Sequence, residues 1–330
     1  MTEDTRDRRI SKRDSAGFFS SAKSFFLPVG EHFAPGTVRG YYIDLRVKTS
    51  TPKRHPGEAT LHVGSIQAGL GCFERYVSGE GDAWFNAARE YAAELVSSQQ
   101  SDGPLAGGFI HRAPLRHTYA LRPPWISAMA QGQAASLLVR IFQETGEQRL
   151  ADSARRALEP LGVDVGAGGV SAMLDGGRFP QEYPTQPPSH VLNGGIFAIW
   201  GLYDVGVALS DAPARAGFET ALDTLVENLY RWDVGYWSRY DLFPHPKTNV
   251  ASSFYHDLHV NQLRAMHRIA PRHQLAETAE RWARYAASPA CRWRAVAHKA
   301  SFRVLVPRNR LLANRLPWSA SVAAHERPRP

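Results

Sequence analysis

Four pairs of helical segments constrain the fold of this 330-residue chain more than any other feature of its sequence. Apolar residues recur at helical spacing in each segment, and a short polar break joins the two members of a pair. The pairs are 60–77 with 82–99, 126–145 with 147–160, 189–208 with 212–231, and 254–270 with 272–288. Their first members begin 66, 63 and 65 residues apart, which indicates one repeated supersecondary unit. The sequence therefore predicts a mainly α fold, an incomplete α/α toroid or barrel of helical hairpins.

Composition and charge divide the chain into three regions. Residues 59–290 are the helical domain, and residues 1–58 and 291–330 are a basic N-terminal arm and a basic C-terminal tail. Residues 291–330 hold 9 Lys or Arg against 1 Asp or Glu, whereas residues 61–290 hold 19 against 23. Within the arm, the alternation of residues 40–48 predicts a strand, one half of a short β-hairpin. Ends as basic as these contact an anionic partner or a membrane surface, or are simply solvated.

The sequence shows no targeting or membrane-spanning pattern. The apolar residues between 18 and 27 are split by Ser, Ala and Lys, and no run approaches the ~20 apolar residues of a spanning helix. Cys72 and Cys291 have no metal or redox spacing, which favours a reducing compartment, with one disulfide as the alternative. We therefore expect a protein that is cytoplasmic or peripheral to the membrane. Its basic ends are expected to contact a membrane or a biosynthetic complex. A homodimer is one possible assembly, and no nucleic-acid partner is expected.

Three long loops collect polar side chains. Loops 100–125, 161–188 and 232–253 each join the second helix of one hairpin to the first helix of the next, so we expect them to meet at one end of the fold. They are rich in Arg, Lys and Tyr. Arg binds carboxylate or sulfate groups through two parallel hydrogen bonds, and aromatic side chains stack on sugar rings. A cleft at this end suits an anionic sugar, and the alternative is an ordinary polar surface.

One stretch delivers a carboxylate and a phenol to the start of an apolar helix. Glu182 and Tyr183 lie in a loop broken by prolines, and Ser189 is expected to cap the helix that follows. Gly194 and Gly195 lie early in that helix, where each costs about 1 kcal/mol relative to Ala. A close approach of the backbone to another segment or to a ligand would explain these glycines.

The fourth hairpin opens with polar residues on a helix. Tyr255, His259 and Gln262 share one face, partly beside an apolar stripe, and hydrogen bonds to loop ends are one explanation for them. His256 and His259 have the i, i+3 spacing of a metal pair, but no third ligand accompanies them, so no metal site is expected. The chain also contains no dinucleotide fingerprint and no phosphate-binding Lys loop, so no cofactor is expected.

Four segments, taken together, resemble the heparan sulfate D-glucuronyl C5-epimerases, specifically their C-terminal catalytic domain. The segments are WISAMAQGQAASLLVR at 125–140, EYPTQPPSHVLNG with GLYD within 182–204, YDL at 240–242 and YHDLHVNQL at 255–263. They occur in the family's order within residues 60–288. The resemblance implies an α/α toroid that inverts C5 of D-glucuronosyl residues in a polysaccharide, giving L-iduronosyl residues. It also implies a short, microbial-type member that acts on a heparosan-like glycan without a cofactor.

The resemblance assigns residues to this reaction. Glu182, Tyr183, Tyr240 and Tyr255 fall on the family's catalytic positions. Glu182 and Tyr255 would be the opposed proton-transfer pair, and the other two would orient the sugar. A basic Tyr would need neighbouring cations to lower its pKa from ~10. The residues expected to bind substrate are Arg112, Arg122, Gln131, Arg178, Asn193, Arg239, His256, His259 and Asn261.

The chain departs from the family pattern after Tyr240-Asp-Leu. Phe243 follows where the family has Arg, so an expected carboxylate-binding Arg is missing. Arg239, Arg122 or Arg178 must substitute for it if the activity is kept. The β-rich domain that precedes the helices in animal members is reduced here to one expected hairpin, which leaves the natural glycan undefined.

Three other functions compete with epimerisation. A uronate polysaccharide lyase shares the same intermediate, and only the loss of the C4 substituent distinguishes it. A glycoside hydrolase needs two carboxylates about 5–9 Å apart, and Glu182 has no obvious partner except Asp241 or Asp257. A catalytically inactive uronate-glycan-binding protein is favoured by Phe243 in place of Arg.

Overall fold

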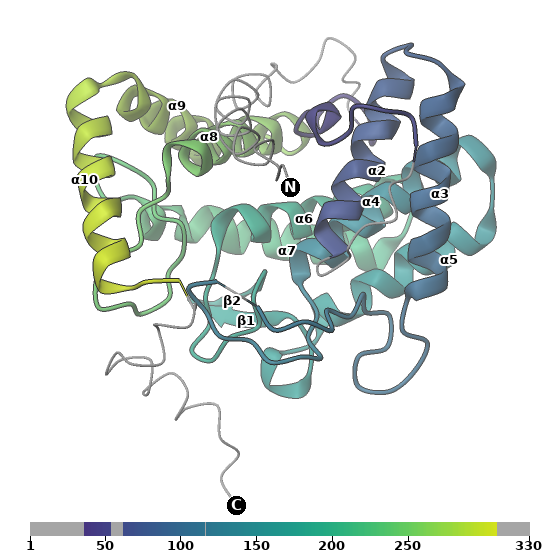
Figure 1. Cartoon of the computed structure of the whole chain (residues 1–330), viewed down its shortest axis with the longest axis horizontal. Helices are drawn as coiled ribbons and strands as arrows, with labels where there is room; N and C mark the ends of the chain where they lie inside the picture. Colours follow the sequence, from purple (N-terminus) through teal and green to yellow (C-terminus); the bar gives the residue numbers. More distant parts are fainter. Residues whose placement is uncertain (1–35, 54–61, 116, 309–330) are drawn as a thin grey trace, which may run out of the picture.

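The structure, a computed structural model, describes residues 36–53, 62–115 and 117–308. Within these ranges the chain forms nine α-helices and one two-stranded sheet, which confirms the mainly α class. Eight of the helices form hairpins and the ninth follows them (Figure 1). The predictions made for residues 1–35 and 309–330 lie outside the described residues.

The four helical hairpins lie where the apolar periodicity predicts them, with ends that differ by at most 3 residues. The pairs are α2 (His62–Val77) with α3 (Asp82–Ser98), α4 (Ala128–Thr145) with α5 (Gln148–Leu158), α6 (Leu192–Ala208) with α7 (Ala212–Asn228), and α8 (Ser253–Ile269) with α9 (His273–Ala287). The first helices α2, α4, α6 and α8 pack on one another in chain order, and each second helix packs on its own first helix. The closure of this array into a toroid stays a prediction.

Side chains cap several of the described helices, but not the helix for which the sequence predicts a cap. Ser127, Asp211 and Ser252 each accept a hydrogen bond from the backbone N–H three residues later, which begins α4, α7 and α8. Ser189 is not the predicted cap, because α6 begins at Leu192 without a side-chain cap. The hydroxyl of Ser189 instead donates to the carbonyl of the Glu182–Tyr183 loop, 2.9 Å from Tyr183 O.

Glycines bring the backbones of α4 and α6 together. A Cβ atom added at Gly201 would lie 2.4 Å from the Cα of Gly132, and one added at Gly132 would lie 2.5 Å from the Cα of Ala198. Such distances leave no room for a side chain on either helix at the crossing. The contact between α4 and α6 is the most extensive between any two elements of the described chain.

A buried ion pair joins the same two helices farther along. Arg140 of α4 donates to Asp204 Oδ2 of α6 at 2.5 Å, and the two side chains are 1% and 0% exposed. Arg140 also donates to the carbonyl of Val38 at 2.6 Å, and the hydroxyl of Tyr41 donates to Asp204 Oδ1 at 2.6 Å. The pair therefore fixes the N-terminal segment on the helices, and removing one partner of such a pair costs about 3–5 kcal/mol.

The predicted N-terminal strand is wrong for the described residues. Residues 40–48 contain no strand, and they end in a short 3₁₀ helix, η1 (Arg46–Lys48). Their apolar side chains pack on helices: the ring of Tyr41 meets that of Trp200 edge-on at 5.4 Å. The carbonyl oxygen of Leu45 lies 2.3 Å from where a Cβ of Gly71 in α2 would be. The alternation in the sequence arises because alternate side chains are buried. Here they are buried against helices, so the alternation does not require a sheet.

The sheet lies instead between the second and third hairpins. Strands β1 (Ser171–Leu174) and β2 (Gly177–Pro180) are antiparallel, and β2 packs on α7. Three short 3₁₀ helices complete the connections, η2 (Glu159–Gly162), η3 (Val165–Ala167) and η4 (Leu229–Trp232). The end of β2 leads directly into the loop that carries Glu182.

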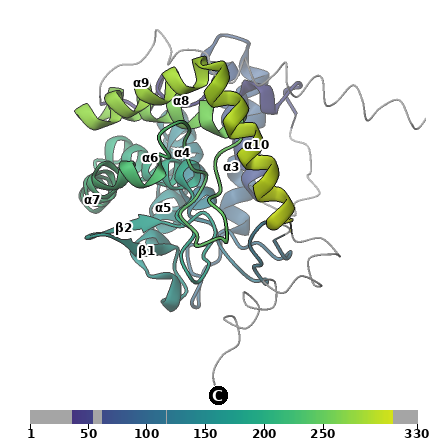
Figure 2. The same ribbon diagram turned by 90° about the vertical axis from the view of Figure 1, so that its left-hand side faces the viewer.

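A further helix, α10 (Pro289–Leu305), lies in the region that the sequence predicts to be a tail. Its side chains Ala295 and Phe302 are buried against the hairpins. α10 lies at the edge of the molecule opposite to α2 and α3 (Figures 1 and 2). No helix in the described part of the chain is long and apolar enough to cross a membrane. The domain boundaries near residues 58 and 290 stay predictions.

Replacing Gly201 by Ala is expected to lower the free energy of unfolding by about 1–3 kcal/mol, because the added methyl group overlaps the backbone of Gly132. Gly64→Ala is the matched control, since Gly64 lies in α2 with nothing within 4 Å of the added atom. Gly64→Ala should raise the free energy of unfolding by about 0.5–1 kcal/mol, because Ala has the higher helix propensity. Urea denaturation measures both changes, and equal stabilities for the two variants would contradict the glycine contact.

Candidate active site

The three long loops meet at one end of the hairpins, as their connectivity predicts. Tyr119 of the first loop lies 5.1 Å from Tyr183 of the second, measured between ring centroids. The hydroxyl of Tyr119 donates to Asp241 Oδ2 of the third loop at 2.5 Å. Backbone hydrogen bonds from Leu192 to Tyr240 O and from Leu242 to Ser189 O attach the third loop to the start of α6.

A cavity of about 230 Å³ lies beside these loops. It is lined by the first helix of every hairpin, by η1 and by two of the loops. The lining residues are Leu45, Lys48, Val63, Gln67, His111, Trp125, Ser127, Met129, Glu182, Tyr183, Asn193, Phe197, Phe254, Tyr255 and Leu258. Four residues predicted from the sequence are among them: Glu182, Tyr183, Asn193 and Tyr255.

Gly194 allows the side chain of Glu182 to enter the cavity. A Cβ atom at Gly194 would lie 2.3 Å from Glu182 Oε2, and one at Gly195 would lie 2.2 Å from the ring of Phe179. The close approach that the sequence analysis invoked for these glycines is therefore confirmed. The preceding residue, Gln181, bonds to the backbone of Val170 and His190, which fixes the loop from which Glu182 projects.

Burial raises the pKa of the Glu182 carboxyl group to about 7, and a hydrogen bond with Tyr183 partly opposes this shift. The side chain is only 7% exposed. In the described structure, Glu182 Oε2 and Asn193 Oδ1 are buried without a hydrogen-bond partner. Because an unpaired buried acceptor is costly, two such atoms in one cavity indicate a place for the donors of a ligand.

Three tyrosines continue from Glu182. Tyr240 shares hydrogen bonds with Tyr183 and Tyr255, and the rings of Tyr240 and Tyr255 meet edge-on at 4.9 Å. Burial raises the pKa of all three phenols, to about 12 for Tyr255 and well above 10 for Tyr183 and Tyr240. For Tyr255, Arg308, a hydrogen bond with Tyr240, and Arg303 lower the pKa and partly offset the burial and the charge of Glu182.

Helix α10 supplies cations behind Tyr240 that the sequence analysis did not identify. Lys299 Nζ lies 5.7 Å from the centroid of the Tyr240 ring and donates to Asn249 Oδ1 at 2.6 Å and Val250 O at 2.7 Å. Burial lowers the pKa of Lys299 to about 7. Arg303 donates to the hydroxyl of Thr118 in the first loop at 2.9 Å. These residues follow the segments that resemble the epimerases, so no motif indicated them.

Lys48 was also missed. It ends η1, and among the described residues that line the cavity it is the one Lys or Arg. Burial lowers the pKa of its ammonium group. Its position depends on the attachment of the N-terminal segment to α4 and α6, a long-range contact that no local pattern predicts.

The structure places several predicted binding residues away from the cavity. The amide of Gln131 is used internally, bonding to the backbone of the first loop and to Ala157 O. The Nδ1 atoms of His256 and His259 lie 2.8 and 2.9 Å from the hydroxyl of Ser238, and Asn261 bonds to the carbonyl one turn earlier. Both histidines therefore link α8 to the third loop, as the structural alternative predicted.

The four predicted arginines do not line the cavity either. Arg112, Arg122 and Arg178 are exposed, and Arg178 donates to the carbonyl of Gly162 beside a different pocket. Arg239 is partly buried and donates to Asp241 O at 3.1 Å. Phe243, in place of the expected Arg, packs edge-on against Tyr119 at 5.4 Å.

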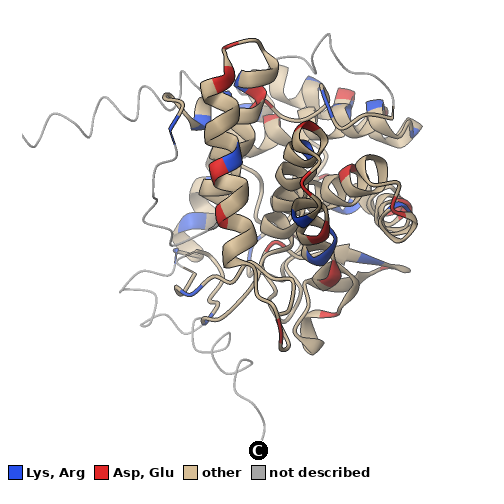
Figure 3. Cartoon of the chain, turned by 90° about the vertical axis from the view of Figure 1, so that its right-hand side faces the viewer, with Lys and Arg blue, Asp and Glu red and all other residues tan. Residues whose placement is uncertain are grey.

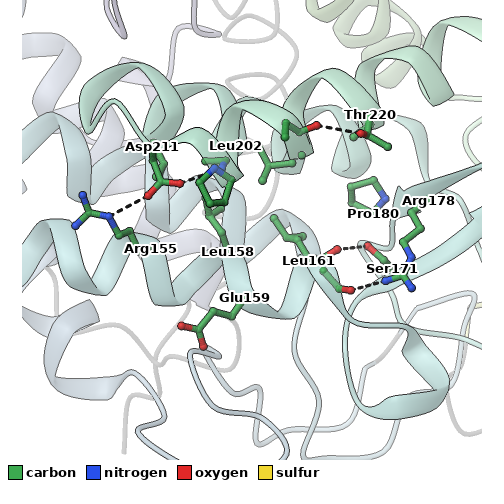
Figure 4. Close-up of a pocket in the computed structure, with 17 residues that line it drawn as sticks. Arg155, Leu158, Glu159, Leu161, Ser171, Arg178, Pro180, Leu202, Asp211 and Thr220 are labelled. Atoms are coloured by element: carbon green, nitrogen blue, oxygen red, sulfur yellow. Dashed lines mark hydrogen bonds and ion pairs between the residues drawn. The ribbon is translucent and has the colours of Figure 1, made fainter.

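That different pocket is larger, about 550 Å³, and lies between α5, α6, α7 and the sheet (Figure 4). Its lining is largely apolar, including Leu158, Leu161 and Leu202. Its best-placed cation, Arg155, is already bonded to Asp211 at 3.0 Å. None of the unpaired buried polar atoms of the described residues belongs to it. The smaller cavity is therefore the better candidate for chemistry.

The described residues contain no group of three or more His, Cys, Asp or Glu side chains placed to hold a metal ion. Cys72 and Cys291 are free thiols, which rules out the disulfide alternative. Among the described lining residues, Glu182 is the one carboxylate. The site thus offers a single buried carboxyl group, neighbouring phenols and one ammonium group, that of the exposed residue Lys48.

Comparison with known proteins supports a relationship over the helical region. The family model described as D-glucuronyl C5-epimerase C-terminus matches residues 109–284. The chain is similar to the D-glucuronyl C5-epimerase of Caenorhabditis elegans, with 32% identity over 214 residues, which are 59% of this chain and 34% of that protein. A protein of Methanocaldococcus jannaschii, described as uncharacterized, is 30% identical over 132 residues, which are 38% of this chain and 42% of its length. The chain thus spans less than half the length of either relative.

Glu182→Gln is expected to weaken the pH dependence of stability between about 4.5 and 7. The pKa of Glu182 is raised in the folded protein, so its contribution is complete below the unfolded value of 4.5 and is lost as pH rises through about 7. The loss in the wild-type protein is about 3 kcal/mol. Urea denaturation near pH 5 and near pH 8 measures it, with Glu90→Gln on the exposed face of α3 as the control. An identical pH dependence in Glu182→Gln and wild type would disprove the raised pKa.

Proposed function

Because the chain belongs to the D-glucuronyl C5-epimerase family, we propose that it inverts C5 of D-glucuronosyl residues within a polysaccharide and produces L-iduronosyl residues. The observation that supports this most is the single cavity that holds both Glu182 and Tyr255. One has a pKa raised to about 7 and the other a pKa of about 12. A proton acceptor and a proton donor thus face the same space.

The reaction needs two proton transfers on opposite faces of the sugar ring. A base removes the hydrogen at C5, which is α to the carboxylate, and an acid returns a proton to the other face. The intermediate carries extra negative charge on the substrate carboxylate, so preorganised donors or cations near that group lower the barrier.

Glu182 suits the role of base for the D-glucuronosyl residue. Its pKa of about 7 leaves a substantial ionised fraction near neutral pH, and its poorly solvated carboxylate is a stronger base than an exposed one. Tyr255, with a pKa raised to about 12, stays protonated at this pH, so it suits the role of acid. The two roles exchange when L-iduronosyl is the substrate.

The other tyrosines connect the pair. Hydrogen bonds link Glu182 to Tyr183, Tyr183 to Tyr240, and Tyr240 to Tyr255. After one inversion, Glu182 holds the abstracted proton and Tyr255 lacks one. A proton shift along this chain restores the starting state, and its groups exchange protons with solvent when the product leaves, while Tyr183 and Tyr240 also orient the sugar.

Lys48 takes the place of the missing family Arg as the partner of the substrate carboxylate. It is the cation that lines the cavity. Lys48 is exposed, and nearby protein atoms desolvate its ammonium group enough to lower its pKa. A charge-assisted hydrogen bond to a carboxylate is stronger than one between neutral groups. Phe243 then no longer favours an inactive binder, because a different element supplies the charge. The exposed Arg112 and Arg122 remain available to later sugar residues of the chain.

The competing reactions are less well supported. A hydrolase requires a second carboxylate, and Asp241 is bonded to Tyr119 and Asn249 away from the cavity. A lyase uses the same first step, so only the product distinguishes it from an epimerase.

Incubation with heparosan, unmodified or N-sulfated, is expected to yield L-iduronosyl residues that proton NMR detects. Glu182→Gln and Tyr255→Phe each remove a proton-transfer group and should lower the rate by about 10²–10⁴-fold. Tyr230→Phe is the matched control, since Tyr230 is 67% exposed on η4. Unsaturated uronate without L-iduronosyl would identify a lyase, and binding without either product would identify an inactive binder.

Lys48→Met is expected to lower kcat/KM by about 10- to 100-fold, because it removes a charged hydrogen-bond donor from the substrate carboxylate. Lys48→Arg should retain most of the activity. Lys53→Met changes an exposed Lys of the same segment and serves as the control. If the wild type is an epimerase and Lys48→Met has the same kcat/KM, the role of Lys48 is rejected and the proposed reaction is not.

A further inference from the structure

Helix α10 presents large apolar side chains to solvent. Trp293, Val296, Val304 and Leu305 are 75%, 50%, 79% and 54% exposed. They are four of the seven large apolar side chains exposed in the described part of the chain, although α10 is one of nine helices there. Single apolar residues scattered over a protein surface are normal, whereas several large ones exposed together indicate an interaction surface.

The exposed apolar residues of α10 other than Leu305 form one stripe. Trp293, Val296, Ala297, Ala300 and Val304 recur at i, i+3, i+4, i+7 and i+11, and every one of them is exposed. This spacing places them on one helix face about 100° wide. The stripe is the kind of apolar face by which an amphipathic helix packs, but it faces away from the hairpins.

The opposite face of α10 is attached to the rest of the protein. Phe302 is fully buried, and Ala295 is 3% exposed. Lys299 donates to Asn249 and Val250, and His298 Nε2 lies 3.0 Å from the carbonyl of Thr248. The helix runs along one edge of the molecule (Figure 2), and the exposed class of the stripe residues places the stripe on its solvent side.

Basic residues flank the stripe on both sides. At 100° per residue, the exposed Arg292 borders one side and the exposed Arg294 borders the other. Residues 289–308 contain no Asp or Glu. On the face that carries α3, by contrast, basic and acidic residues are interspersed (Figure 3), and pairs such as Arg89 with Glu147 join them.

We propose that α10 docks the protein on an anionic lipid surface, with the apolar stripe inserted at the interface and the flanking arginines on lipid phosphates. A helix with an apolar face containing Trp and with Arg beside it binds in this way, and each basic residue near an anionic membrane contributes about 1 kcal/mol. The proposal does not depend on the epimerase reaction.

Charge disfavours two other occupants of the stripe. Two copies packed through α10 about a twofold axis would bring their basic flanks together. Residues 309–330 contain 4 Arg and 1 Glu, so they repeat the charge of α10 and do not complement it. An anionic surface satisfies both the apolar stripe and its basic borders.

Co-sedimentation with lipid vesicles tests the proposal on the full chain. The protein should bind vesicles of phosphatidylcholine mixed with phosphatidylglycerol at least about tenfold more strongly than vesicles of phosphatidylcholine alone. Trp293→Glu combined with Val304→Glu should lower the partition coefficient on the mixed vesicles by about tenfold or more. Trp293→Phe should retain binding, and Met173→Glu, at a 59% exposed position on β1, is the matched surface control.

Circular dichroism and thermal unfolding establish that the double variant keeps its fold. Equal binding by the folded double variant and the wild type would overturn the proposal. Absence of vesicle binding by the wild type would also overturn it. Light scattering would then distinguish a dimer that Trp293→Glu dissociates from a monomer whose stripe binds an acidic protein.

Discussion

The close contact between α4 and α6 is the constraint on which the rest of the structure depends. Gly132 and Gly201 let the two backbones meet, and Arg140 and Asp204 then lie close enough to form a buried pair. That pair also holds Val38 and Tyr41, so the N-terminal segment is attached where the central helices meet. Lys48, seven residues after Tyr41, consequently reaches the cavity that the hairpins enclose. A contact far from the cavity thus decides whether Lys48 lines it.

A second close contact at a glycine determines the environment of the Glu182 carboxyl group. Gly194 gives up helix propensity so that Glu182 can lie against the backbone of α6, shielded from water. Shielding raises the pKa of the carboxyl group toward neutrality, where a group can both accept and release a proton. The same burial keeps the neighbouring phenols protonated. The local cost in stability and the reactivity of the site therefore have one origin, the removal of a carboxylate from water.

The sequence predicted much of the fold and the centre of the site because the relevant signals are local. Helical periodicity located every hairpin, and connectivity alone placed the three long loops at one end. The motif residues Glu182, Tyr183 and Tyr255 lie together as expected. The failures come from long-range packing. Alternation at 40–48 arises because side chains are buried on helices, which a strand template cannot distinguish. Residues of α10 gave no signal, since their basic composition is equally typical of a solvated tail.

The residues predicted to bind substrate line the cavity less often than the four motif residues do, for a physical reason. Arg side chains in loops are common and their direction is not encoded locally, so Arg112, Arg122 and Arg178 were plausible but point elsewhere. Gln131 and His256 look like ligand-binding groups in sequence, yet they satisfy buried backbone and side-chain atoms between elements. A polar residue in a core helix has two uses, and only the positions of its partners decide between them.

The most direct test of two opposed proton-transfer groups is the reaction carried out in D₂O and followed by NMR at early conversion. If Glu182 and Tyr255 act on opposite faces, each new L-iduronosyl residue carries deuterium at C5, while unreacted D-glucuronosyl residues still carry hydrogen. L-iduronosyl residues that retain the original hydrogen would contradict the account. Deuterium in D-glucuronosyl residues without any L-iduronosyl would contradict it as well, because it would mean that only one face exchanges its proton.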